Sequence, residues 1–318
     1  MKRKYKVIIT IVSLLLILFV GAGFFAGNYF YNLALDPNTD KSAVLNAPHN
    51  SIAISPKETK EKEEREKWFK ENYEDSFIQS FDDLNLHSYT LKNTKETNKW
   101  AIVFHGYSSD GTQMTKYAKH FYDKGFNVLI PDARAHGKSE GDYIGMGWHD
   151  RFDVVSWINN VIDSDKNAEI VLYGISMGGA TVMMASGENL PDNVKAIIED
   201  CGYSSVWDEF SYQLQSIFNL PAFPIMHFSS IVTKLRADYT LGEANTVEQV
   251  AKSKTPMLFI HGSNDTFVPS DMLNEVYEAA NVPKEKFIVE GAGHGGAESV
   301  AEDSYWETIN NFLTKYLE

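Results

Sequence analysis

The chain has 318 residues, enough for one large α/β domain with additional segments. A net charge of −14 and the lack of a basic patch argue against a nucleic-acid-binding protein. The single cysteine, Cys201, excludes an internal disulfide and a cysteine-rich metal site.

The N-terminus predicts a membrane anchor. Four basic residues (Lys2, Arg3, Lys4, Lys6) precede an uncharged stretch, and its most apolar part, Val7–Phe25, would be about 28 Å long as a helix. This run is longer than a signal-peptide core, and aromatic residues follow it where a cleavage site would have small ones. We therefore expect an uncleaved anchor rather than a cleaved signal peptide, with residue 1 in the cytoplasm and the rest outside.

Polar and charged residues separate this anchor from the globular part. Residues 36–56 predict a spacer, and residues 58–73 predict a charged helix that is solvated, unless Trp68 and Phe69 dock it onto the domain. All 43 acidic residues and 25 of the 29 basic ones follow the anchor, so the outer part carries a net charge of −18. We expect it to be repelled by anionic surfaces.

Strands and helices alternate in the remaining chain. Residues 76–91 predict two antiparallel strands, and buried strands are expected at 99–106, 127–132, 169–173, 194–200, 255–262 and 284–290. Helices are expected at 115–124, 148–162, after residue 178, at 270–280 and at 299–317. This order predicts a doubly wound, mostly parallel sheet, with functional groups at the carboxyl ends of its strands.

The pentapeptide Gly174-Ile-Ser-Met-Gly178 lies between a predicted strand and a predicted helix. In that context G-x-S-x-G indicates a nucleophile elbow, in which Ser176 stands on a strained turn and the glycines avoid collisions across it. The following helix would direct its N-terminus at the serine and leave the Met177 N–H free for an oxyanion.

A nucleophilic serine needs a base and an orienting acid, and both are expected at strand ends. His294, between glycines after the last strand, is the preferred base, and His136 is a weaker rival. Asp265, after the strand at 255–262, is the preferred acid, and Asp200 is its rival. The other candidates at strand ends are expected to shape turns: His105, His261 and Asp132.

From about Phe77 onward the chain resembles the α/β-hydrolases. The resemblance rests on His105-Gly106, on Asp132-Ala-Arg-Ala-His-Gly-Lys-Ser139, on the Ser176 pentapeptide, on Gly262-Ser-Asn-Asp265 and on Gly293-His-Gly295, with serine, aspartate and histidine in that family's order. Among them, the chain looks like the single-span, surface-anchored bacterial serine hydrolases. The resemblance implies a second oxyanion donor at the Tyr107 N–H and no metal or organic cofactor.

The aromatic-rich stretch at about 203–250 interrupts the alternation where this family inserts a cap. A cap would provide an apolar wall for an acyl group, with Phe223 as one candidate residue, although the stretch could also be extra core. We expect short to medium acyl esters of neutral alcohols to be preferred, because fewer than fifty residues cannot enclose a long chain.

These observations predict three parts: an anchor at 1–35, a spacer and charged helix at 36–75, and an α/β-hydrolase domain with a small helical cap at 76–318. We expect a membrane-anchored, extracytoplasmic carboxylic ester hydrolase that uses Ser176, His294 and Asp265. A peptidase or acyltransferase on the same residues, and a non-catalytic surface binding protein, are the alternatives.

Overall fold

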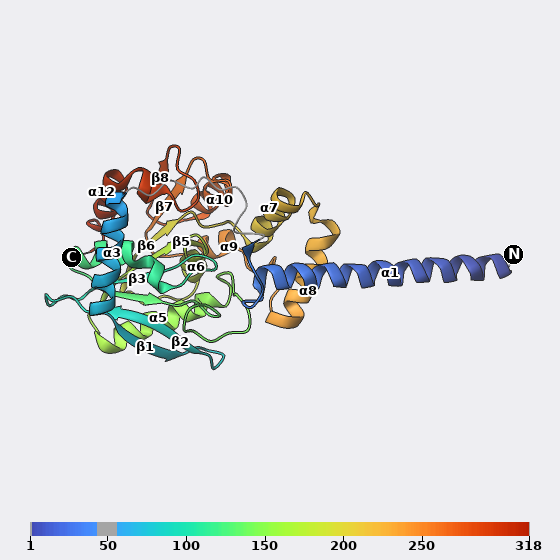
Figure 1. The fold of residues 1–318 in the computed structure, drawn as a ribbon, viewed down its shortest axis with the longest axis horizontal. Helices are drawn as coiled ribbons and strands as arrows, with labels where there is room; N and C mark the ends of the chain where they lie inside the picture. The colour runs from blue at the N-terminus through green and yellow to red at the C-terminus, as the bar shows by residue number, and fades with distance from the viewer. Residues whose placement is uncertain (1, 43–55, 318) are drawn as a thin grey trace.

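At the centre of the fold lies a twisted eight-stranded sheet, seen in a computed structural model that describes residues 2–42 and 56–317 (Figure 1). Its strand order is β1-β2-β4-β3-β5-β6-β7-β8. The strands are β1 Glu74–Gln79, β2 Asn85–Leu91, β3 Lys99–Phe104, β4 Asn127–Pro131, β5 Glu169–Ile175, β6 Val194–Asp200, β7 Met257–Gly262 and β8 Lys284–Val289.

The sheet is antiparallel at one edge and parallel elsewhere. Strand β2 pairs antiparallel with both β1 and β4, and all the remaining neighbours pair parallel. The predicted doubly wound, mostly parallel sheet is therefore confirmed. The carboxyl ends of β3, β5, β6 and β7 lie next to one another at a single edge.

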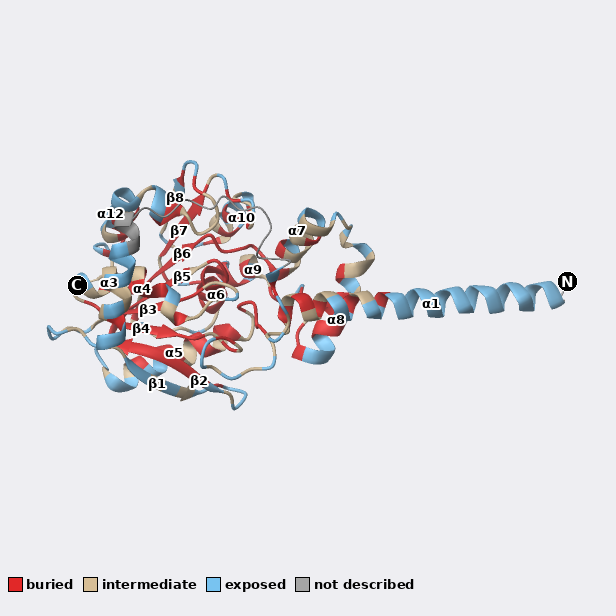
Figure 2. Ribbon diagram, viewed as in Figure 1, coloured by how far each residue is buried: buried red, intermediate tan, exposed pale blue. Residues whose placement is uncertain are grey.

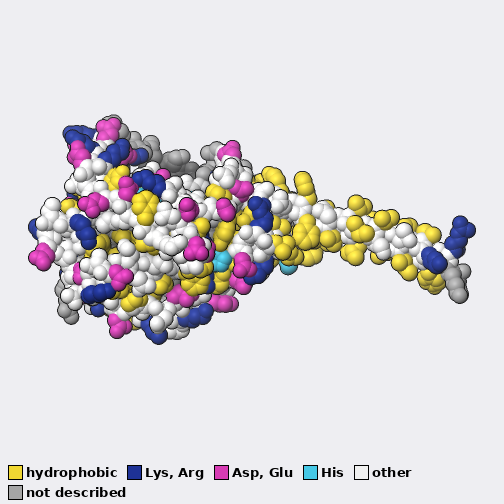
Figure 3. Space-filling view, turned by 90° about the horizontal axis from the view of Figure 1, so that it is seen from below, with side chains coloured by type: hydrophobic (Ala, Val, Ile, Leu, Met, Phe, Trp, Pro, Cys, Tyr) yellow, Lys and Arg dark blue, Asp and Glu magenta, His cyan; other side chains and the backbone are white. Residues whose placement is uncertain are grey.

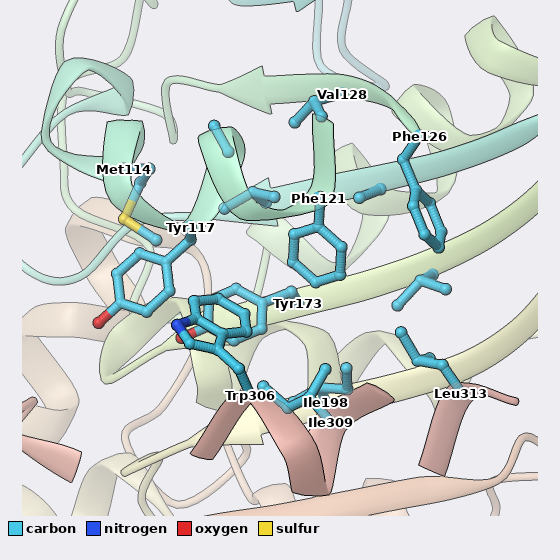
Figure 4. Packing of buried hydrophobic residues seen from close by; sticks show 14 of the residues in the cluster. Met114, Tyr117, Phe121, Phe126, Val128, Tyr173, Ile198, Trp306, Ile309 and Leu313 are labelled. Atoms are coloured by element: carbon cyan, nitrogen blue, oxygen red, sulfur yellow. The ribbon is translucent and has the colours of Figure 1, made fainter. Parts of the chain in front are cut away.

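Helices cover both faces of the sheet, because alternate strand residues are apolar on both sides. Alternate residues of β5 illustrate this: Val171 and Tyr173 face one cluster, and Ile170 and Leu172 face the other. Figure 4 shows the first cluster, in which Tyr117 stacks on Tyr173 and Phe121 packs edge-on against it. The helices of this face are α3 Pro56–Asn72, α4 Thr115–Asp123 and α12 Glu302–Leu313, and those of the other are α5 Asp150–Ser164, α6 Met177–Ala185 and α10 Asp271–Ala279.

The charged helix α3 docks on the domain. Its Phe69 is only 2% exposed and packs against Tyr73 and Tyr89, while Trp68 contacts the ring of Tyr122 on α4. The docking alternative is thus correct, and the expectation of a fully solvated helix is wrong. Most of the spacer that precedes it, residues 43–55, lies outside the described residues.

Three helices are inserted between β6 and β7, where the sequence predicts the cap. They are α7 Val206–Phe218, α8 Ala222–Ala237 and α9 Thr246–Val250, and a bridge between Ser205 and Asn245 closes the base of the insertion. Helix α9 packs on α6 and α10 rather than on the rest of the insertion. The part that stands away from the sheet is therefore α7 and α8 (Figure 1).

Helix α1 is continuous from Lys2 to Leu35 and projects from the body (Figures 1 and 2). By length and composition it could cross a membrane, a criterion that signal sequences also meet. Residues 3–22 are all exposed, whereas Tyr31, Leu33 and Leu35 are buried in the body. The end of the predicted anchor is therefore part of the folded domain, which the sequence pattern did not foresee.

Two glycines allow α8 to lie against α1. A Cβ on Gly23 would come within 2.2 Å of the Phe228 ring, and one on Gly27 within 2.7 Å of the Phe228 backbone. This is the close approach that a G-x-x-x-G spacing permits between helices. The Phe228 ring packs edge-on against both Phe19 and Phe24.

We expect Gly27→Val to weaken this packing. The added side chain would collide with backbone atoms of Phe228, and backbone atoms cannot move aside as the end of a flexible side chain can. The overpacking should lower the free energy of unfolding by about 1–3 kcal/mol, measured by thermal unfolding of the full chain in detergent. Gly21→Val is the matched control, since a Cβ there meets nothing within 4 Å. Equal effects of the two substitutions would contradict a specific contact at Gly27.

Candidate active site

Ser176 lies on a strained turn between β5 and α6. Its backbone has φ 55° and ψ −119°, a region that non-glycine residues rarely adopt. A Cβ on Gly174 would lie 2.1 Å from the Gly178 carbonyl oxygen, and one on Gly178 would lie 2.3 Å from that of Phe104. The structure therefore requires both glycines of the pentapeptide for this turn. The Ser176 N–H donates to the Asp200 carbonyl (2.7 Å), which ties the turn to β6.

Ser176, His294 and Asp265 lie in one hydrogen-bonded relay. The Ser176 hydroxyl is 2.8 Å from His294 Nε2, and His294 Nδ1 is 2.7 Å from Asp265 Oδ2. The three residues come from the turn after β5 and from the loops after β8 and β7, at the edge where the parallel strands end. The structure thus brings together the three residues singled out in the sequence as nucleophile, base and acid.

The carboxylate of Asp265 is held ionised by several donors. Its Oδ1 accepts from the backbone N–H groups of Phe267 and Val268, each at 2.9 Å, and His261 Nε2 lies 3.3 Å from Oδ2. Burial alone would raise the pKa of Asp265, but the hydrogen bonds from His261 and His294 hold it well below the usual carboxyl value. An ionised Asp265 can keep the His294 proton on Nδ1 and leave Nε2 free to accept the Ser176 proton.

The rival acid points elsewhere. Asp200 is fully buried, and its Oδ2 accepts from the Tyr305 hydroxyl (2.7 Å), which also bonds Tyr173. Burial raises the pKa of Asp200 to about 6. Its side chain supports the core behind the turn and makes no hydrogen bond to His294 in the described chain.

His105 is engaged in a turn at a strand end, as expected, and the rival base His136 is also held by hydrogen bonds within its loop. His105 Nδ1 donates to the Gly106 carbonyl and Nε2 accepts from the Ala133 N–H, and burial lowers its pKa to about 4. His136 accepts at Nε2 from the Ser108 N–H (3.3 Å) and lies 8% exposed. Neither ring has a free nitrogen with which to deprotonate Ser176.

Asp132 bonds the loop that follows it, as expected, and also the loop after β3. Its carboxylate accepts from the backbone N–H groups of Gly111 and Lys138, at 2.8 and 2.9 Å.

Two backbone N–H groups near Ser176 are available for an oxyanion. Among the described residues, neither the Met177 N–H nor the Tyr107 N–H has an acceptor. The loop after β3 runs close to the serine, since a Cβ on Gly106 would lie 3.4 Å from Ser176 Cβ. The Tyr107 phenol does not serve as a further donor there, because it donates to the Ala34 carbonyl (2.6 Å) at the end of α1.

One group in the described ranges has the composition of a metal site. Cys201, Asp265 and His294 have potential ligand atoms within 4.8 Å of one another. Both nitrogens of His294 are already hydrogen-bonded, and burial raises the pKa of the Cys201 thiol, which keeps it protonated. The arrangement fits the serine relay better than a metal centre.

Two hollows lie beside Ser176, one a small apolar cavity and the other a wider open cleft. The apolar cavity, of about 80 Å³, lies between the serine, the cap and the end of α1, and the wider open cleft lies on the other side. Residues of the apolar cavity include Phe30, Tyr31, Leu33, Ala34, Met146, Glu209, Leu214, Ile217, Phe218, Ile225, Met226 and Thr233. The open cleft is lined by Ser109, Gln113, Met114, Tyr117, His294 and Gly295, and both hollows contact Tyr107 and Phe267.

Phe223 does not line either hollow. It is 68% exposed on the outside of the cap, so the expectation that it contributes to an acyl wall is wrong. The hydrophobic wall comes instead from α7, the inner face of α8 and α1.

Glu209 is a residue of the site that the sequence pattern missed. It is 3% exposed on α7, lines the apolar cavity and accepts from Gln213 Nε2 (2.8 Å). In the described structure, its second oxygen has no hydrogen-bond partner. Burial, opposed by the Gln213 bond, raises the pKa of Glu209 to about 8, so the carboxyl is protonated at neutral pH. The available signal was its position on the side of α7 that also carries Val206 and Leu214, both buried.

We expect Glu209 to limit activity at high pH. Above about pH 8 its ionisation places a negative charge in the apolar cavity, close to Asp265 and His261, and kcat/KM for an uncharged ester should fall. Glu209→Gln keeps the neutral shape and should remove this fall. A pH profile from 6 to 10 for both proteins measures it, and identical profiles would contradict the role of Glu209.

Because folding raises the pKa of Glu209, this carboxyl also makes the stability of the folded chain fall as the pH rises. The pKa of Glu209 is raised on folding, so the folded chain keeps a proton that the unfolded chain releases above about pH 4.3. Its contribution to stability is therefore lost as the pH rises towards 8. Thermal unfolding of Glu209→Gln should depend less on pH across this window than that of the unsubstituted chain.

A mostly parallel eight-stranded sheet, with a serine on the sharp turn after β5 and a helical insertion after β6, is the α/β-hydrolase fold. Comparisons with known proteins support this fold. Residues 95–217 match the family described as serine aminopeptidase, S33. An esterase of Pyrococcus furiosus, Pf2001, superimposes with a TM-score of 0.63 at 21% identity, over 86% of this chain and 100% of that one.

Two relatives of similar length are themselves uncharacterised. The Bacillus subtilis protein YqkD is 29% identical over 221 residues, which is 69% of this chain and 72% of that protein. The uncharacterised yeast membrane protein YNL320W is 22% identical over 76% of this chain and 79% of its own. The chain has the α/β-hydrolase fold and is similar to hydrolases of that superfamily, and the apolar helix α1 is compatible with its resemblance to single-span members.

Proposed function

We propose that this protein is a membrane-anchored serine esterase that cleaves carboxylic esters through an acyl-enzyme. The observation that carries the proposal is the relay from the Ser176 hydroxyl through His294 to Asp265, with links of 2.8 and 2.7 Å. Ser176 would attack the acyl carbonyl while His294 takes its proton. The Met177 and Tyr107 N–H groups would bind the oxyanion, each contributing about 3 kcal/mol to transition-state stabilisation.

The two hollows suggest where the halves of the ester lie. His294 must donate its proton to the leaving oxygen, and it lines the open cleft but not the apolar cavity. The alcohol would therefore occupy the open cleft, and the acyl chain would occupy the apolar cavity. Water would enter through the cleft to hydrolyse the acyl-enzyme.

The match to a serine aminopeptidase family favours amide hydrolysis as a second candidate. p-Nitrophenyl butyrate and butyryl p-nitroanilide share one acyl group and differ in the leaving atom, so they test the two directly. We expect the ester to be cleaved at least about a hundredfold faster in kcat/KM. Comparable rates would favour the peptidase, and acyl transfer to an added alcohol would favour an acyltransferase.

We also propose that α1 is an uncleaved anchor with the hydrolase domain outside the cytoplasmic membrane. The basic residues before the apolar run, Lys2 to Lys6, support this orientation. The intact protein should stay with membranes through a high-salt wash, and protease added from outside should degrade its domain. A shortened, soluble product as the main form would indicate a signal peptide instead.

A further inference from the structure

The wall of the apolar cavity that faces away from the sheet belongs to the anchor helix. Phe30, Tyr31 and Ala34 of α1 line it together with Phe218 of α7 and Ile225 of α8. The rings of Phe30 and Phe218 pack edge to face, with centroids 5.3 Å apart. The hollow beside Ser176 thus extends to the place where α1 leaves the body.

The cap reaches along α1 towards its free part. Helix α8 runs in the same direction as α1, because its Phe228 contacts Phe19 and Phe24 and its Arg236 bonds Asn28. The start of the regular part of α8, after the kink at Phe223, therefore lies closer to the exposed part of α1 than Phe228 does. The apolar run Val7–Phe25 is about 28 Å long as a helix, close to the thickness of a hydrocarbon core, and Phe19 and Phe24 near its end contact Phe228. A bilayer around this run would place α7 and α8 at its surface.

Exposed apolar side chains lie on both α1 and α8. Phe25 on α1 is 78% exposed, and Phe223 and Leu235 on α8 are 68% and 74% exposed. Figure 3 shows hydrophobic side chains continuing from the projecting helix onto the adjoining end of the body. These exposed side chains, called the apolar collar below, are unfavourable in water and stable against lipid.

We propose that the substrate is an ester of a membrane lipid, and that its hydrocarbon chain enters the apolar cavity directly from the bilayer at the junction of α1, α7 and α8. This inference rests on the proposed esterase function and on the anchor. The chain would stay in an apolar medium throughout, so the small cavity need not enclose it, and the limit to short acyl groups expected from the cap's length would not apply. The polar alcohol half would face water in the open cleft.

The reaction balances with water as the only co-reactant. Ser176 Oγ forms a bond to the acyl carbon, the ester C–O bond breaks, and His294 returns the serine proton to the leaving alcohol. Water then attacks the acyl-enzyme, gives its proton to His294, and releases the fatty acid while Ser176 recovers its hydrogen.

The proposal is tested with the full chain in phosphatidylcholine vesicles. The probes are 4-methylumbelliferyl stearate, placed either in the same vesicles or in separate ones, and 4-methylumbelliferyl butyrate in water. We expect stearate hydrolysis to be at least about tenfold faster from the same vesicles, and butyrate hydrolysis to be equal in both arrangements. Equal stearate rates, or butyrate cleavage without stearate cleavage, would overturn lateral entry. Failure to cleave either ester would overturn the proposed esterase function as well.

A matched pair of substitutions tests the route. Phe223→Asp introduces a charge into the apolar collar, and Phe77→Asp makes the same change at a 52% exposed phenylalanine on the edge strand β1. Neither residue lines the apolar cavity or the open cleft. We expect Phe223→Asp to slow stearate hydrolysis about tenfold and leave butyrate hydrolysis unchanged, which also shows that the variant folds. Phe77→Asp should change neither rate, and equal effects of the two substitutions on stearate would overturn the proposal.

Discussion

Replacing Ser176 by alanine should abolish labelling by a fluorophosphonate probe and lower kcat for an ester by about 10⁶. The reason is geometric: the Ser176 hydroxyl lies on the strained turn at the end of β5 and 2.8 Å from His294 Nε2. The probe reacts with a serine that has a base in reach, so its labelling reports the nucleophile independently of any substrate. Mass spectrometry of the labelled peptide measures the site directly.

The control for this prediction is Ser156→Ala. The Ser156 hydroxyl bonds the Phe152 carbonyl within α5 and lines neither hollow, so its loss should leave labelling intact. Labelling that survives Ser176→Ala would show that another serine is the nucleophile and would remove the basis of the proposed esterase.

The sheet and the Ser176 turn were predictable because their signals are local. Buried parallel strands appear as short apolar runs, and a strand, a G-x-S-x-G sequence and a helix in succession constrain the backbone strongly. The end of α1 was not predictable in this way. An apolar helix looks uniform in sequence whether it contacts lipid or protein, and the spacing of Gly23 and Gly27 is a weak mark of the part that packs on α8.

The cap helices show a second reason why the sequence predicted the wrong place for a residue. Its aromatic residues indicate burial in general, but one helix face cannot be told from the other without knowing what α8 packs against. Phe228 therefore packs on α1, while Phe223 lies exposed on the outside. Glu209 was overlooked for the opposite reason, because a charged residue on an amphipathic helix is usually exposed.

The choice between Asp200 and Asp265 depends on side-chain direction, which strand positions alone do not determine. Asp200 is the last residue of β6 and Asp265 follows β7, but Asp200 turns towards Tyr305 and Asp265 towards His294. The sequence could order the two candidates only by resemblance. In the structure, the backbone N–H groups of Phe267 and Val268 hold the Asp265 carboxylate in place.

We therefore expect Asp265→Asn to lower kcat by about 10⁴, because an amide at this position cannot fix the imidazole tautomer with Nε2 free. The loss should appear in kcat more than in KM, since Asp265 touches the imidazole rather than either hollow. Asp200→Asn is the comparison: it keeps an acceptor for Tyr305 and should lower stability more than kcat. Steady-state kinetics with p-nitrophenyl butyrate and thermal unfolding of both variants separate the two effects. If Asp200→Asn were the more damaging to kcat, with its unfolding unchanged, the roles of the two carboxylates would have to be exchanged.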